Sequence, residues 1–329
     1  SAAFIAPPVI PVRDANGNFT DPQDFNIPGV SVNPALNLEN QNNQATGINL
    51  LTNVFAEVNL LKDKNLKLRS SLGTEYRQSN GRSYNRAFFV SENLFDSIPS
   101  LSKTRTVNTQ YFWDNTISYQ KSIGDHEFTL LGGFSAQEFR TNFLTASRQN
   151  VEDFGESTYY LTLGDAEGQS NNDGGSLIRG LSYFGRLFYS YKNKYLLNFT
   201  LRSDGSSTFA ENFRYGTFPS VGAGWVVSEE NFFDVGPIDF LKIRGSYGQL
   251  GNNNIPQNEF TQTTSQGGIY SVVFADGQIR TGENITSAVA PALQWEVVEE
   301  YDFGVEAILL NDKLSINADY FRRTTKDAL

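Results

Sequence analysis

A repeat of apolar residues at every second position, in adjacent runs within residues 181–225, constrains the fold of this chain more than any other feature. From Leu181 to Tyr191, every second residue is apolar, aromatic or glycine, and the residues between them are mixed. After the polar turn 192–194, the alternation resumes over 195–202. A period of two in two runs joined by a short turn is typical of a β-hairpin. Each run is long enough to cross a bilayer as a tilted strand, which takes about 9–11 residues.

This hairpin unit recurs along the chain. We expect about ten strands in five pairs, at 51–61, 66–77, 105–120, 127–140, 181–191, 195–202, 215–225, 241–248, 293–309 and 314–325. Short turns (62–65, 121–126, 192–194, 311–313) alternate with long loops (78–104, 141–178, 203–214, 249–292). Outer-membrane barrels have short periplasmic turns and long extracellular loops. The pattern therefore predicts an all-β, antiparallel transmembrane β-barrel with its short turns in the periplasm.

Tyrosines gather beside the predicted turns, at Tyr119, Tyr189, Tyr191 and Tyr195. Amphipathic rings at this height form the interfacial girdles of membrane barrels. The alternative is that tyrosine simply favours strands.

Residues 1–50 differ from the rest of the chain in composition. They contain Pro7, Pro8, Pro11, Pro22, Pro28 and Pro34 together with many Asn and Gly residues. Such a composition is typical of irregular segments. We therefore expect an irregular extracellular or loop segment at 1–50 and a β-barrel wall of hairpins over 51–329.

Composition excludes several classes of protein. The formal net charge of -10 and a pI near 4.8 argue against nucleic acid as a partner. The mean hydropathy is -0.38 and no apolar run reaches roughly 18 residues, which excludes a transmembrane helix but not a barrel. With no cysteine and a single histidine, His126, most metal and acid–base sites are excluded. The chain also lacks methionine and a signal peptide, so we expect a fragment of a longer protein.

Three short motifs could carry chemistry, but each has a simpler structural interpretation. His126 is expected to be a solvated turn residue. The run 204–207 (D-G-S-S) could be a nucleophile loop, but a turn that ends a strand is favoured. The run 14–18 (D-A-N-G-N) is similar to a Ca²⁺ loop but lacks the later bidentate glutamate, which favours a plain turn. The sequence therefore indicates no enzyme and no catalytic, cofactor or metal residues.

The acidic residues Glu296, Glu300, Asp302 and Glu306 have even spacing, so they share one face of a strand. We interpret that face as the hydrated lumen wall, with Arg202, Arg214 and Arg244 on the same interior. Aromatic residues in the predicted loops could stack on sugars or hold peptides, and they could equally pack the loops: Phe88, Phe89, Tyr159, Tyr160 and Tyr270. The substrate-binding residues stay unassigned.

Several motifs occur in order over about residues 181–329. R-x-D-G-S-S lies at 202–207, N-x-R-Y-G at 212–216, F-P-S at 218–220 and G-W at 224–225. L-K-x-R-x-S-Y-G follows at 241–248, and L-x-W-E at 293–296 precedes D-x-G at 302–304 and D-Y at 319–320. This combination resembles the SusC/RagA family of TonB-linked (TonB-dependent) outer-membrane transporters of Bacteroidetes-type bacteria.

The resemblance implies a large barrel of about 22 strands with a plugged lumen, a TonB-contacting segment and a SusD-like surface lipoprotein as partner. The sequence contains no plug-like segment and no TonB box, so we expect only part of the barrel wall. The transported substrate would be a bulky oligosaccharide or peptide. The expected location is the bacterial outer membrane, with the wall against membrane lipid.

Two other functions remain open from the sequence. One is a structural or accessory barrel subunit of an outer-membrane assembly that transports nothing. The other is a secreted soluble β enzyme or carbohydrate-binding module, which would have to fold its apolar faces onto each other.

Overall fold

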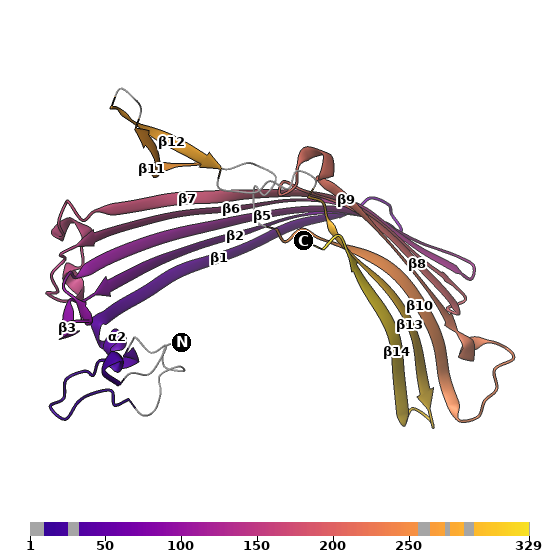
Figure 1. Ribbon diagram of the computed structural model, residues 1–329. Coiled ribbons are helices and arrows are strands. Elements are labelled where there is room, and N and C mark those ends of the chain that lie inside the picture. The colour runs from indigo at the N-terminus through magenta and orange to yellow at the C-terminus, as the bar shows by residue number, and fades with distance from the viewer. Residues whose placement is uncertain (1–9, 26–32, 256–263, 274–276, 286–292, 329) are drawn as a thin grey trace. The chain divides into compact units, whose positions relative to one another are not determined.

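The computed structural model describes residues 10–25, 33–255, 264–273, 277–285 and 293–328, and within them strands dominate (Figure 1). Ten strands form one sheet, in which each is hydrogen-bonded to the next. Their order is β1 (Gln41–Asn59), β2 (Leu66–Asn85), β5 (Ser100–Ile123), β6 (His126–Gln149), β7 (Ser170–Tyr191), β8 (Tyr195–Ser206), β9 (Tyr215–Val226), β10 (Ile238–Asn252), β13 (Glu296–Leu309) and β14 (Leu314–Lys326). The predicted ten strands and their hairpin order are confirmed.

Smaller elements lie between the long strands. Two ribbons form, β3 (Phe88–Ser91) with β4 (Leu94–Asp96) and β11 (Thr264–Val273) with β12 (Ile279–Ile285). The 3₁₀ turns are η1 (Pro22–Phe25), η2 (Glu156–Thr158), η3 (Leu161–Leu163), η4 (Glu211–Phe213) and η5 (Val227–Glu229). Helix α2 (Pro34–Asn40) is capped by the side chain of Asn33, which accepts from the Ala35 N–H. Across the described residues, every helix is too short or too polar to cross a membrane.

The strands extend further than the alternation predicts. Strand β1 begins at Gln41 and α2 at Pro34, so the expectation of an irregular segment at 1–50 is wrong for 34–50. Likewise, the expected loops 78–104 and 141–178 contract to 86–99 and 150–169. The extensions carry polar residues on both faces, so backbone pairing continues there without a period-two signal.

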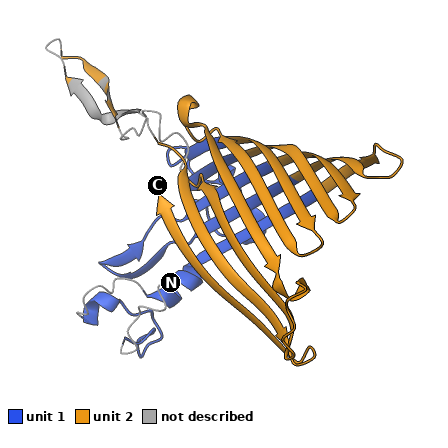
Figure 2. Ribbon diagram, turned by 90° about the vertical axis from the view of Figure 1, so that its right-hand side faces the viewer, with its two compact units in different colours: residues 1–51, 75–109, 140–176 blue, residues 52–74, 110–139, 177–329 orange. Residues whose placement is uncertain are grey.

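The chain divides into two compact units (Figure 2). Unit 1 consists of 1–51, 75–109 and 140–176, with a buried cluster of Tyr84, Leu101, Val151 and Tyr159. Unit 2 consists of 52–74, 110–139 and 177–329, and its buried cluster contains Phe209, Phe218 and Trp295.

Within unit 2 the register gives the sheet an apolar face and a polar face. Directly paired residues point to the same side of a sheet. One row of pairs across β7, β8, β9, β10 and β13 consists of Leu187, Phe199, Val221, Tyr247 and Tyr301. The adjacent row on the opposite side consists of Arg186, Thr200, Ser220, Gly248 and Glu300. The apolar row includes Phe199 and Tyr301, which are 43% and 57% exposed, as expected for side chains that meet lipid.

Two aromatic residues mark the height of the apolar face on β9. Tyr215 and Trp225 begin and nearly end the strand, and their positions differ by ten (225 − 215). Ten residues span about 33 Å along a strand. At a tilt of about 45° this corresponds to a height of about 23 Å, close to the apolar band of membrane barrels.

Aromatic rings cluster where β6, β7 and β8 meet their short turns. The ring centroids of Phe128 and Tyr189 are 5.0 Å apart, and those of His126 and Tyr191 are 4.7 Å apart. Tyr191 also stacks on Tyr195, and His126 Nδ1 lies 2.8 Å from the Tyr189 hydroxyl. Three of the four tyrosines expected in a girdle therefore join one cluster. His126 begins β6 rather than lying in the turn, although it is exposed as expected.

One carboxylate of the β9–β10 connection holds the rings of Tyr195 and Trp225. Glu230 accepts hydrogen bonds from the Tyr195 hydroxyl at 2.5 Å and from the Trp225 indole at 3.1 Å. Lys194 Nζ lies 3.5 Å from its other oxygen. The hydrogen bonds from Tyr195 and then Trp225 hold the pKa of Glu230 below its usual value. The contacts therefore favour the charged carboxylate.

Glu230→Gln is expected to lower the thermal unfolding midpoint of the full-length protein in detergent at pH 7. Because the folded pKa of Glu230 is depressed, its stabilisation is present above the unfolded pKa and is lost as pH falls through the folded value. Wild type and variant should therefore converge in acid, once the pH lies below the folded pKa of Glu230. Glu229→Gln, at the exposed neighbouring position, should leave the midpoint unchanged. A difference between wild type and Glu230→Gln of equal size at pH 7 and in acid would contradict the assignment.

Candidate functional site

The polar face of β10, β13 and β14 carries a network of charged side chains. We call it the charge network, and its members are Lys242, Arg244, Glu300, Asp302, Glu306, Asp319 and Arg323. Lys242 Nζ lies 3.2 Å from Glu306 Oε1, and Arg323 Nη2 lies 2.6 Å from Glu300 Oε2. The register brings these residues together, because Lys242 pairs directly with Glu306 and Glu300 with Arg323.

Arg244 lies at the centre of the network and contacts three carboxylates. Its Nη1 donates to Asp302 at 2.9 Å and its Nη2 to Asp319 at 2.5 Å. Its Nε lies 3.2 Å from Glu306 Oε1, an ion pair without hydrogen-bond alignment. A planar guanidinium can serve several acceptors in this way, whereas an ammonium group cannot present the same fork. Arg244 therefore links all three strands.

Gly304 makes this arrangement possible. It pairs with Arg244 on one side and with Asp319 on the other. The Arg244 side chain passes over Gly304 to reach β14. A Cβ at position 304 would meet Asp319 Oδ1 and would lie 2.8 Å from Arg244 Nε. The glycine of the D-x-G motif is therefore a steric requirement of the charge network.

The sequence-based interpretation of the acidic residues is confirmed in its geometry. Glu300, Asp302 and Glu306 share one face, and Glu296 accepts from Asn252 at the same side of β13. Arg244 joins them as expected. The sequence reasoning missed Asp319 and Arg323 as partners, because only the register of β14 against β13 places them beside these residues.

The charge network can line a hydrated passage, but it offers little for acid–base catalysis. Each of its carboxylates already has a cationic partner, whereas acid–base catalysis uses pairs of titratable groups in contrasting environments. Its members are partly exposed, with Arg244 and Asp319 at 36% and 41%. Individual exposed pairs contribute about 0–1 kcal/mol. The network therefore mainly supports the pairing of β10, β13 and β14 and gives their polar face its charged surface.

Gly304→Ala is expected to destabilise the full-length protein by about 1–3 kcal/mol, because the new methyl group would displace Arg244 or Asp319. Denaturant unfolding measures this change. In combination with Asp319→Asn the two losses should be less than additive, since both break the same contact.

Gly245→Ala is the matched control for that variant. A Cβ at position 245 would find its nearest neighbour, the Asp302 carbonyl oxygen, at 3.8 Å, an ordinary contact. Equal losses for the Gly304 and Gly245 variants would show that the bridge over Gly304 is not the cause.

Residues of the N-x-R-Y-G, F-P-S and L-x-W-E motifs pack together in unit 2 with Phe209, which follows the R-x-D-G-S-S motif. The ring centroids of Phe209 and Phe218 lie 5.1 and 5.5 Å from that of Trp295. The Trp295 indole donates to the Arg214 carbonyl at 3.2 Å. A side chain at Gly251 would overlap the Phe218 ring. These residues therefore form a buried contact between the β8–β9 connection and the start of β13.

The D-G-S-S run ends strand β8 at Ser206, as expected. Arg202 Nε donates to both oxygens of Asp204 at 2.7 and 2.8 Å. The Ser206 hydroxyl is buried and bonded to the Thr208 hydroxyl, so it is not an exposed nucleophile. The expectation that Arg214 lies on the interior face with the acidic residues is wrong. Its exposed side chain borders a cavity on the apolar face instead.

In unit 1, only some of the loop aromatics singled out in the sequence are available to a ligand. Tyr159 is 3% exposed and stacks on Tyr84 with ring centroids 4.3 Å apart, so it packs the loop. Phe89 and Tyr160 are 73% and 59% exposed. The side chain of Tyr270 lies outside the described residues.

Loop 150–169 is tied to the end of β2 by polar contacts around the Tyr84–Tyr159 stack. The Tyr84 hydroxyl donates to the Val151 carbonyl at 2.7 Å, and Arg86 Nε donates to Asp153 at 2.6 Å. The Arg86 contact, with a hydrogen bond from Tyr159, holds the pKa of Asp153 below its usual value. This anchor should therefore weaken in acid as Asp153 is protonated.

Tyr84→Phe is expected to loosen loop 150–169, because it leaves the buried Val151 carbonyl without its donor, a loss of about 1–3 kcal/mol. Limited proteolysis of the full-length protein should cut this loop faster. Tyr160→Phe removes a hydroxyl from an exposed ring in the same loop and serves as the control. Identical cleavage rates in the two variants would rule out the Tyr84 contact as the anchor.

The remaining motif is a turn. Asp14 Oδ1 accepts from the N–H groups of Asn16 and Asn18, and Gly17 has a φ of 87°. Among the described residues, no group of three or more His, Cys, Asp or Glu side chains could hold a metal ion. Residues 14–18 therefore form a turn, as the sequence predicts.

Comparison with known proteins supplies relatives for almost the whole chain. The family described as TonB dependent receptor-like, beta-barrel, matches residues 10–329. TonB-dependent receptor P26 of Formosa agariphila is 32% identical over 69% of this chain and 23% of its own length. TonB-dependent receptor SusC of Bacteroides thetaiotaomicron is 29% identical over 92% of this chain and 29% of its own length. The chain thus spans less than a third of the curated relatives it matches.

A solved structure shares the fold. The structure described as the RagAB peptide transporter matches with a TM-score of 0.79 at 23% sequence identity. The match covers 95% of this chain and 34% of that one. The predicted fold class, an antiparallel outer-membrane β-barrel segment, is confirmed.

Proposed function

The chain belongs to the TonB dependent receptor-like β-barrel family, and on that basis we propose that it forms part of the wall of a TonB-dependent importer. The family consists of outer-membrane transporters rather than enzymes, and the chain is an integral part of an outer-membrane barrel. The observation that carries the proposal is the two-faced register of β7–β13, with exposed apolar rows on one side and charged rows on the other.

The proposed cargo is a bulky nutrient, an oligosaccharide or a peptide. One relative bears the name SusC, and a protein of the same fold is described as a peptide transporter. The polar face supports a water-filled passage for such cargo, because its charges are paired but still partly exposed. The proposed partner is a SusD-like surface lipoprotein that covers the outer cavity.

In this proposal the short turns lie in the periplasm and the long connections outside. Import would be driven by the inner-membrane proton gradient through TonB, which other parts of the full-length protein would contact. The wall itself would supply lipid contact on one face and a hydrated lining on the other. This chain would therefore transport nothing alone.

The test is uptake by cells that lack the gene and carry the full-length protein on a plasmid. Labelled oligosaccharide and peptide mixtures are supplied, and the wild type should restore uptake of one class. Collapse of the proton gradient with an uncoupler should abolish it. Purification from native membranes should recover a stoichiometric lipoprotein.

A different result would favour the accessory role. Recovery in a large assembly without ligand, together with normal growth on every supplied nutrient after deletion of the gene, would contradict the importer.

A further inference from the structure

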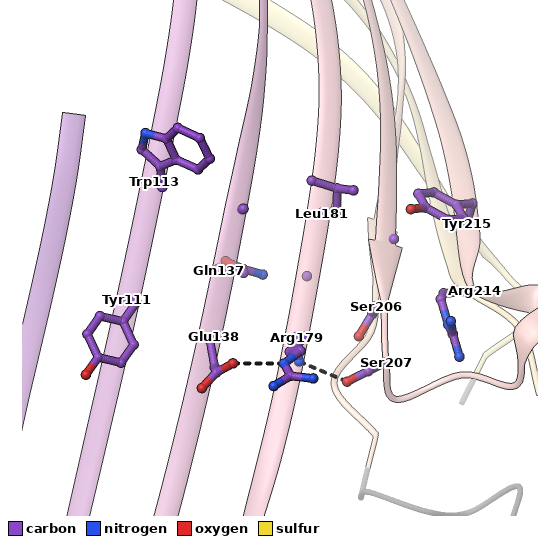
Figure 3. Close-up of a pocket in the computed structure, with 13 residues that line it drawn as sticks. Tyr111, Trp113, Gln137, Glu138, Arg179, Leu181, Ser206, Ser207, Arg214 and Tyr215 are labelled. Atoms are coloured by element: carbon purple, nitrogen blue, oxygen red, sulfur yellow. Dashed lines mark hydrogen bonds and ion pairs between the residues drawn. The ribbon is translucent and has the colours of Figure 1, made fainter. Parts of the chain in front are cut away.

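A cavity of about 650 Å³ opens on the apolar face of unit 2, across β5–β9 (Figure 3). The apolar face here carries Tyr111 and Trp113 of β5, Glu138 of β6, Arg179 of β7 and Tyr215 of β9. Tyr215 lies at the end of the apolar band opposite to Trp225. The cavity is therefore at the level where lipid headgroups meet acyl chains, beside the long β8–β9 connection.

The polar part of the cavity is basic. Arg179 Nε donates to Glu138 at 2.8 Å, and the Arg179 N–H donates to the Ser207 hydroxyl oxygen at 2.9 Å. The terminal nitrogens of Arg179 have no hydrogen-bond partner among the described residues. Arg214 faces the cavity from the other side (Figure 3), and its guanidinium likewise has no ion-pair partner in the described part of the chain.

The apolar part of the cavity is a slot between aromatic walls. Trp113 and Tyr215 flank it, with Leu181 between them (Figure 3). The floor is low because Ala136 and Gly205 carry little or no side chain. A Cβ at Gly205 would lie 2.5 Å from the Tyr215 ring, so this glycine also allows Tyr215 to pack flat across β8. The slot runs on from the basic part toward the middle of the apolar face.

We propose that this cavity binds a phosphorylated glycolipid of the outer leaflet, with a phosphate at Arg179 and Arg214 and an acyl chain between Trp113 and Tyr215. The local charge of two arginines and one glutamate is positive, in a chain whose net charge is -10. Arginine forks match phosphate oxygens in geometry and charge. Ser207 and the Tyr111 hydroxyl offer neutral hydrogen-bonding groups of the kind that sugar hydroxyls use.

A second cavity on the same face has apolar walls but no unpaired cationic side chain. It measures about 440 Å³ and lies over Ala223 and Gly245, between Trp225 and Phe303. Arg244 borders it, but the guanidinium lies on the polar face, where Asp302 and Asp319 hold it. A cavity without a free cation suits acyl chains alone, so the glycolipid site is assigned to the first cavity only.

The test is native mass spectrometry of delipidated full-length protein in detergent, titrated with diphosphorylated lipid A. We expect Arg214→Gln to weaken binding roughly tenfold, since one charge-assisted contact is lost. Trp113→Ala should weaken it as well. Arg322→Gln, at an exposed position on the apolar face of β14, is the control and should bind like wild type. Retained heat-modified mobility on gels would show that each variant is folded.

Two other lipids complete the test. Dephosphorylated lipid A and phosphatidylglycerol should both bind at least tenfold more weakly than lipid A. Equal binding of dephosphorylated lipid A would overturn the phosphate assignment. Equal binding of phosphatidylglycerol would overturn the glycolipid assignment, and unchanged binding by Arg214→Gln would overturn the site. The inference rests on the outer-membrane location and on the proposed orientation with the long connections outside. It does not rest on import, because binding in detergent needs neither TonB nor cargo.

Discussion

The structure depends on the pairing of backbone N–H and C=O groups between neighbouring strands. Hydrocarbon offers these groups no partner, and only helices and β-barrels satisfy them internally. The long antiparallel strands of this chain meet that requirement through continuous registers, such as the one joining β10 and β13 from Asn252 to Leu241. Once the backbone is paired, side-chain chemistry is free to differ completely between the two faces. That freedom produces an apolar row beside a charged one.

Glycines and charges on the polar face act together. Gly304 leaves space for the Arg244 side chain, and Arg244 joins carboxylates from two other strands. The L-K-x-R, D-x-G and D-Y motifs thus belong to one cross-strand network, although Arg244 and Asp319 lie 75 residues apart in the chain. Aromatic residues have a second role, since Tyr215 and Trp225 mark the two levels of the apolar face. Different residues of the same strands therefore carry the charges of the polar face and mark the edges of the apolar face.

Much of this architecture could be predicted from the sequence, because alternation is strong wherever one face meets lipid. Tyr195–Leu201 illustrates a strand whose faces were assigned correctly. The signal fails in the polar extensions of β1, β2 and β7, where neither face is apolar and only backbone pairing continues. It also fails for Arg214, whose place on the apolar face depends on the β8–β9 connection. Partners such as Asp319 require the register, which a single sequence does not specify.

The most direct test is the accessibility of single cysteines along β8. The chain has no cysteine of its own, so residues 196–201 can be replaced one at a time in a full-length protein without other cysteines. A nitroxide at positions 197, 199 and 201 should be relaxed most by oxygen, which concentrates in lipid. At positions 196, 198 and 200 it should be relaxed most by a water-soluble nickel complex. Uniform accessibility along the strand would contradict a wall with one lipid face and one water face.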